Sequence, residues 1–176
     1  MLSTLCDAAN DVVTEGGGAV TFIGPAHLDV VCRPIALRRA VANLIGNAVS
    51  YADGGVVTLR PTGGGLRIAV EDCGPGIPDN ELERVFEPFH RLEGSRNRTT
   101  GDVGLGLTIA RQSVAEQGGT LVLANRPDGG LSAVITLPVV PAELSLTAVK
   151  DNSRHLDLPT WEAPTSSSPG HLAHSP

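Results

Sequence analysis

The 176-residue chain is poor in aromatic residues, which make up 3% of it, and it carries no excess of positive charge. With few rings available, the core must be built from aliphatic side chains, for which an apolar fraction of 41% supplies enough material. The formal net charge of −6 argues against binding to nucleic acid or to an anionic membrane, because both need clustered positive charge. We therefore expect no nucleic acid partner and no membrane contact by this chain.

Long apolar runs and paired cysteines are also missing. No segment approaches the roughly 18 apolar residues needed to cross a bilayer, and residues 1–10 lack the basic and apolar regions of a signal peptide. The cysteines, Cys6, Cys32 and Cys73, are odd in number and far apart, which fits neither a zinc site nor a disulfide framework. A reduced, cytoplasmic protein is the simplest interpretation.

Hydrophobic periodicity divides the chain into helices and strands. The clearest helix spans residues 34–51, where Pro34 suits the first turn and Leu37, Val41, Leu44 and Ala48 form an apolar stripe. Further helices are expected at residues 1–13, 79–85 and 105–117. Strands are expected at residues 19–23, 28–32, 56–60, 66–71, 121–124 and 132–137.

Residues 90–103 and 141–176 lack this periodicity. The first segment predicts a mobile loop, and the second, rich in Pro, Ser, Thr and His, predicts a disordered tail. The expected organisation is one folded domain, residues 1–140, followed by the tail. Its helices and strands do not strictly alternate, which favours an α+β fold: a two-layer α/β sandwich with a mixed, mostly antiparallel sheet covered by three helices.

Two motifs place polar groups beside this predicted core. Asn43, Asn47 and Tyr51 share one face of the long helix, and amide oxygens there suit Mg²⁺, although the same pattern fits a solvated helix face. Asp72 ends an apolar strand, and Gly74 and Gly76 follow it. An ionised carboxylate there could accept a hydrogen bond from an exocyclic amine such as that of adenine, and a simple strand-end turn is the alternative.

Two more motifs flank the irregular loop. Residues 101–107 place Gly104 and Gly106 before a helix, where backbone N–H groups can bind phosphate, although a flexible hinge would use the same glycines. On the other side, Phe86 and Phe89 are expected to anchor the loop. Arg91, Arg96 and Arg98 in the loop can reach a phosphate, although surface arginines are usually just solvated.

The order and spacing of these motifs together resemble the ATP-binding catalytic domain of bacterial sensor histidine kinases. The resemblance covers residues 2–138 and includes an asparagine box at 43–48, glycine boxes at 72–77 and 104–107, and a phenylalanine box at 86–89. It implies that Asn47 binds Mg²⁺, that Asp72 binds the adenine amine and that residues 90–103 form an ATP lid. The site implied by the motifs and the resemblance comprises Asn43, Asn47, Tyr51, Asp72, Gly74, Gly76, Ile77, Arg91, Gly104, Leu105, Gly106 and Leu107.

One position separates the branches of this superfamily. Its hydrolysing members have a Glu one turn before the magnesium asparagine, where this chain has Asn43. An amide cannot take a proton from water, so the resemblance favours phosphotransfer over hydrolysis. Two departures, Ser50 and Val103, each remove a polar phosphate contact that the family often has. A slow ATPase would need a base elsewhere.

None of the five histidines lies in the acceptor motif of a sensor kinase. The resemblance therefore implies a protein-histidine kinase module that needs a histidine-bearing dimerisation domain from another chain or a missing part of its own protein. It would pass the γ-phosphoryl group of Mg-ATP to that histidine, and a response regulator receiver domain would take it in a two-component phosphorelay. The alternative is a degenerate nucleotide-binding regulatory module without kinase activity.

Overall fold

The computed structural model describes residues 19–25, 28–29, 32–92, 104–138 and 145–146. The helix predicted at residues 1–13, most of the predicted ATP lid and the tail beyond residue 146 lie outside the described residues. In chain order the elements are β1 (Ala19–Ile23), β2 (Leu28–Asp29), α2 (Pro34–Ala52), β3 (Gly54–Thr62), β4 (Gly65–Glu71), the 3₁₀ turns η1 (Asp79–Glu81) and η2 (Arg84–Phe86), α3 (Gly106–Ala115), β5 (Thr120–Asn125), β6 (Leu131–Pro138) and β7 (Ser145–Leu146).

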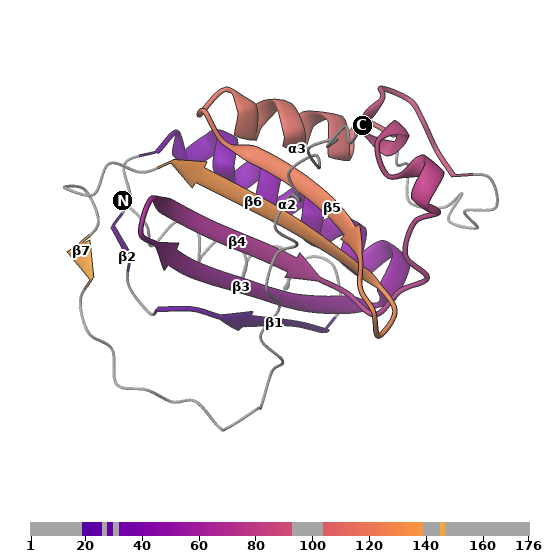
Figure 1. Ribbon diagram of the computed structural model, residues 1–176, viewed down its shortest axis with the longest axis horizontal. Helices are drawn as coiled ribbons and strands as arrows, with labels where there is room; N and C mark the ends of the chain where they lie inside the picture. Colours follow the sequence, from indigo (N-terminus) through magenta and orange to yellow (C-terminus); the bar gives the residue numbers. More distant parts are fainter. Residues whose placement is uncertain (1–18, 26–27, 30–31, 93–103, 139–144, 147–176) are drawn as a thin grey trace, which may run out of the picture.

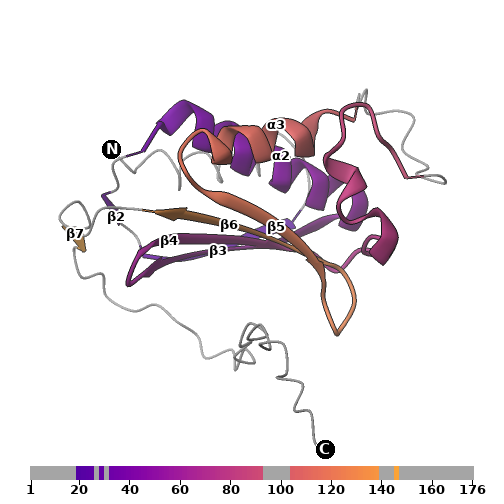
Figure 2. The same ribbon diagram turned by 45° about the horizontal axis from the view of Figure 1, so that its top comes forward.

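Five strands form one mixed sheet in the order β1-β3-β4-β6-β5. β1 runs parallel to β3, and the other neighbouring pairs are antiparallel. Helices α2 and α3 lie side by side on one face of this sheet (Figures 1 and 2). The predicted two-layer α+β sandwich is confirmed, and α2 and α3 correspond to the helices predicted at residues 34–51 and 105–117.

The core lies between the helices and the sheet and is almost entirely aliphatic. All four residues of the predicted apolar stripe on α2 are buried. They face alternate residues of the central strands, such as Ile68 on β4 and Ile135 on β6. Because α2 and β4 are both anchored in this core, the polar residues at the end of each element are held in fixed positions.

The helix predicted at residues 79–85 is wrong. The segment forms two single 3₁₀ turns, closed by the bonds from Glu81 N–H to Pro78 O (2.8 Å) and from Glu87 N–H to Arg84 O (2.9 Å). So short a segment cannot stabilise an α-helix by itself, and two turns allow Val85 and Phe86 to enter the core.

Residues 145–146, within the predicted tail, pair with β2 as an antiparallel two-stranded sheet. Of the strand predicted at residues 28–32, the structure describes β2 alone as extended. No helix in the described ranges is both long and apolar enough to cross a membrane.

Candidate functional site

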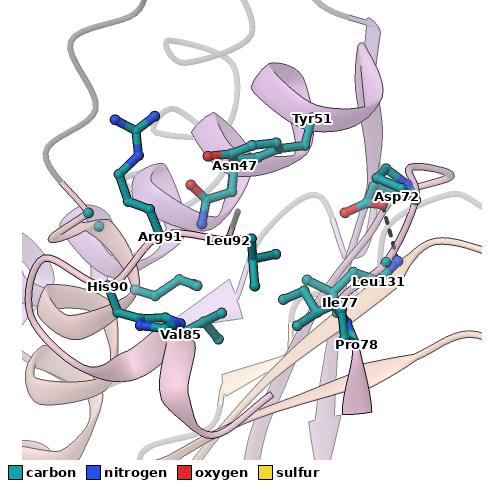
Figure 3. A pocket seen from close by; sticks show the side chains of 15 residues that line it. Asn47, Tyr51, Asp72, Ile77, Pro78, Val85, His90, Arg91, Leu92 and Leu131 are labelled. Carbon is teal, nitrogen blue, oxygen red and sulfur yellow. Dashed lines mark hydrogen bonds between the residues drawn. The ribbon is translucent and has the colours of Figure 1, made fainter. Parts of the chain in front are cut away.

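A cavity of about 410 Å³ opens where the end of α2 meets the start of α3. Figure 3 shows α2 contributing Asn47 and Tyr51 to one side of it, while Asp72 and Ile77 lie on one wall and His90 and Arg91 on the other. Five separate segments of the sequence therefore form one cavity. Its lining residues are Asn47, Tyr51, Asp72, Pro75, Gly76, Ile77, Pro78, Val85, His90, Arg91, Leu92, Gly104, Gly106, Leu107 and Leu131.

Most of the site residues predicted from the sequence line this cavity. Three of them do not: Asn43, Gly74 and Leu105. Asn43 lies one turn from Asn47, and a Cβ built on Gly106 would be 3.9 Å from its side chain, so Asn43 packs against the start of α3. Gly74 instead acts on Asp72, to which its N–H donates a hydrogen bond.

The carboxylate of Asp72 is fixed by one of its two oxygens. Oδ1 accepts hydrogen bonds from the N–H groups of Gly74 (2.9 Å) and Leu131 (3.1 Å). Among the described residues no hydrogen bond engages Oδ2. One oxygen is thus held by the protein while the other is left for a ligand, and an ionised carboxylate can only accept from it. This geometry suits an amine donor such as that of adenine.

Asn47 is half-buried and its amide points into the cavity (Figure 3). Within the described part of the chain this amide makes no hydrogen bond, which is unusual for a polar group below the surface. The described residues contain no cluster of three His, Cys, Asp or Glu side chains that could hold a metal ion alone. An amide oxygen plus nucleotide phosphates is, however, a donor set that Mg²⁺ accepts, so Asn47 fits the implied ion.

The second glycine box forms the opposite end of the cavity. Gly104 has φ +74°, and its carbonyl accepts a hydrogen bond from the N–H of Phe89 at 3.0 Å. Helix α3 starts two residues later without a side-chain cap, so backbone N–H groups of its first turn remain available beside the cavity. Thr108 Oγ1 donates to Phe86 O at 2.9 Å and ties this helix to the phenylalanine box.

The prediction that both phenylalanines of that box anchor the loop is wrong for Phe89. Phe86 is 3% exposed and packs in the core, and the guanidinium of Arg111 lies 4.3 Å from its ring centre. Phe89 is 68% exposed and has φ +66°, a conformation that a non-glycine residue rarely adopts. Its hydrogen bond to Gly104 fixes this backbone, so the main chain and not the second ring holds this end of the box.

Several lining residues are not among those predicted from the sequence, and His90 is the most polar of them. His90 Nε2 lies 2.6 Å from Glu81 Oε2, and Arg84 Nη1 lies 2.6 Å from Glu81 Oε1. The hydrogen bond from His90, followed by the charge and hydrogen bond of Arg84, lowers the pKa of Glu81. His90 directly follows the phenylalanine box in the sequence. Its pairing with Glu81 could not be predicted, because Glu81 lies in the segment that was expected to be a helix.

The sequence is similar to that of several known proteins. Residues 32–141 match the family model described as "Histidine kinase-, DNA gyrase B-, and HSP90-like ATPase". The chain is 36% identical over 139 residues to "Sensor-like histidine kinase SenX3" of Mycolicibacterium smegmatis, a match that covers 77% of this chain and 36% of SenX3. It is 39% identical over 101 residues to "Signal transduction histidine-protein kinase BaeS" of Escherichia coli, which covers 55% of this chain and 21% of BaeS. The chain thus spans about a third or less of these relatives.

Solved structures show the same architecture. The ATP-binding domain of PrrB from Mycobacterium tuberculosis has 31% sequence identity and a TM-score of 0.63, covering 78% of this chain and 93% of that domain. The mycobacterial sensor histidine kinase MprB has 28% identity and a TM-score of 0.66, covering 79% of this chain and 95% of that chain. The family model spans more than half of this sequence, so the chain belongs to the histidine kinase-, DNA gyrase B- and HSP90-like ATPase family.

Proposed function

We propose that this chain binds Mg-ATP in the cavity between Asn47 and Asp72 and serves as the phosphate-donating half of a protein-histidine kinase. The observation that carries the proposal is the carboxylate of Asp72, which lines the cavity: Oδ1 accepts from two backbone N–H groups, and no hydrogen bond within the described residues engages Oδ2. Membership of the ATPase family and the sensor kinases among the relatives support the same role. A structural neighbour, full-length ShkA, was solved with AMPPNP at 26% identity and a TM-score of 0.61, covering 78% of this chain and 29% of ShkA.

In this proposal one side of the cavity binds the adenine base and the other side binds the phosphates. Asp72 accepts a hydrogen bond from the adenine amine, and Tyr51 and Ile77 enclose the base. The first turn of α3, which begins at Gly106, offers backbone N–H groups to the phosphates, which Arg91 can also approach. Mg²⁺, when bound to Asn47, would neutralise charge on the phosphates.

The reaction needs no base from this chain. An imidazole nitrogen of the acceptor histidine attacks the γ-phosphorus, the bond to the bridging oxygen breaks, and ADP leaves. The cavity supplies position and charge stabilisation. The acceptor would lie on a dimerisation domain, and the receiver domain of a response regulator would then take the phosphoryl group. The chain would work at the cytosolic end of a larger sensor.

Calorimetric titration with ADP and with a non-hydrolysable ATP analogue, each with and without Mg²⁺, tests the binding site. We expect micromolar, magnesium-dependent affinity. In Asp72→Asn the carbonyl oxygen can still accept from Gly74 and Leu131, but an NH₂ group replaces the free oxygen. Loss of a hydrogen bond to a charged group should raise the Kd about ten- to a hundredfold while the Tm stays nearly constant.

Glu71→Gln is the matched control, because Glu71 is the neighbouring acid and bonds Ser132 outside the cavity. Equal ADP affinity in wild type and Asp72→Asn would contradict the proposed adenine contact. Phosphotransfer to a separately supplied dimerisation domain then tests the kinase step. Nucleotide binding without phosphotransfer would favour the degenerate regulatory module, which Ser50 and Val103 also favour because both lack the family's phosphate contact.

A further inference from the structure

The loop that carries Asp72 is held in place by the hairpin of β5 and β6, whose strand β6 pairs with β4. This loop, residues 72–79, follows β4, and the hairpin turn between β5 and β6, residues 125–131, lies against it. At one end of the loop, Leu131 N–H donates to Asp72 Oδ1, and Arg126 Nη1 donates to Asp72 O at 2.8 Å. The hairpin therefore contacts both the backbone and the side chain of Asp72.

Asn125 holds the other end of the loop. Its Oδ1 accepts from Ile77 N–H at 2.9 Å, while its Nδ2 donates to Ile77 O at 2.6 Å and to Asp79 Oδ1 at 3.0 Å. One amide thus satisfies both backbone groups of Ile77, as a neighbouring strand would. A Cβ built on Gly76 would lie 2.6 Å from Asn125 Oδ1, so the side chain packs directly over that glycine.

We propose that Asn125 is a positioning residue for nucleotide binding that acts through Asp72. Four residues separate Asp72 from Ile77, and two of them, Gly74 and Gly76, are glycines. With Ile77 released, these glycines can rotate freely, and the bond from Gly74 N–H that orients the carboxylate is lost. Asn125 itself is outside the lining of the cavity, so it has no direct contact with a ligand there.

The inference rests on the proposed role of Asp72 as the adenine contact, and a comparison of two nucleotides tests it. ADP carries the exocyclic amine, whereas inosine diphosphate carries a carbonyl in its place, which cannot donate to Asp72 from that position. If Asn125 acts through Asp72, Asn125→Ala should weaken ADP binding about tenfold and inosine diphosphate binding far less. A loss that is equal for both nucleotides would overturn the proposal, because it would indicate a general structural role.

Ser132→Ala is the matched control, since Ser132 lies on the same hairpin and loses one side-chain hydrogen bond, to Glu71, outside the cavity. We expect it to leave both affinities unchanged. Asn125→Asp provides a second variant in case Asn125→Ala folds poorly. It keeps an acceptor for Ile77 N–H but loses the donor to Ile77 O, so the selectivity for ADP should fall in the same direction.

Amide hydrogen exchange separates this inference from the proposed function. In wild type the N–H groups of Gly74 and Ile77 should be protected, and Asn125→Ala should expose both while the protection of β4 and β6 remains. Unchanged protection of Ile77 in Asn125→Ala would overturn the positioning role, whether or not nucleotide binds. Failure of wild type to bind ADP, with the exchange result as expected, would refute the adenine site and with it the action through Asp72, but would leave the hairpin contact established.

Discussion

The two glycine boxes lie on opposite sides of one cavity, but they are held in different ways. The first, around Asp72, is fixed by side chains and a backbone amide from a hairpin about fifty residues further along the chain. The second, around Gly104, is fixed by contacts with the phenylalanine box, which is nearer in the sequence, through Phe89 N–H and Thr108 Oγ1. The side proposed to bind the base therefore depends on the sheet, and the side proposed to bind phosphate depends on the start of α3.

The largest loss of stability should come from adding a side chain where the hairpin contacts the first glycine box. A Cβ on Gly130, which has φ +94°, would lie 2.0 Å from Asp72 O. Backbone strain and overpacking together should make Gly130→Ala destabilising by about 3 kcal/mol or more in denaturant-induced unfolding. Gly129→Ala is the control, because Gly129 has a similar φ of +92° but nothing within 4 Å of its Cβ, and about 1–2 kcal/mol is expected. Equal losses in the two variants would mean that the hairpin can move away from Asp72.

A smaller loss of stability is expected from a substitution beside the second glycine box. Thr108→Val keeps the shape of the side chain but removes the bond to Phe86 O, so unfolding should become easier by about 1 kcal/mol. Because this bond lies far from Asp72, any loss of nucleotide affinity should be the same factor for ADP and inosine diphosphate. A change in selectivity for ADP, measured by calorimetry, would contradict the division of the cavity into two separately held sides.

The smallest change in stability should come from Glu81, the acid that contacts His90. The pKa of Glu81 is lowered in the folded protein, so its ionised form contributes stability above the unfolded value of about 4.5. This stability is lost as the pH falls through the lowered pKa. The Tm difference between wild type and Glu81→Gln should therefore be present near neutral pH and shrink below about pH 4.5. A difference that stays constant across this range would show that the charge of Glu81 is not responsible.

The residues that face the cavity with polar side chains could largely be predicted from the sequence. Asn47 and Asp72 stand out because an amide on an apolar helix and a carboxylate at the end of an apolar strand need a polar partner. The contacts that hold them could not be predicted. Leu131 acts through its backbone N–H, which every residue except proline has. Asn125 is an exposed residue at the end of β5, and nothing in the sequence indicates its bonds to Ile77. Phe89 was misjudged because its positive φ arises from a hydrogen bond to Gly104, fifteen residues away.

The contact between the hairpin and the Asp72 loop also has a consequence for how the protein folds. The bonds from Ile77 to Asn125 and from Leu131 to Asp72 join residues 48 and 59 positions apart. Contacts of such long range form late, since a long stretch of chain must be ordered first. A chain still emerging from the ribosome would carry Asn47, Asp72 and Gly104 well before it could join them into a site. Nucleotide binding would then report that the last two strands of the sheet have paired.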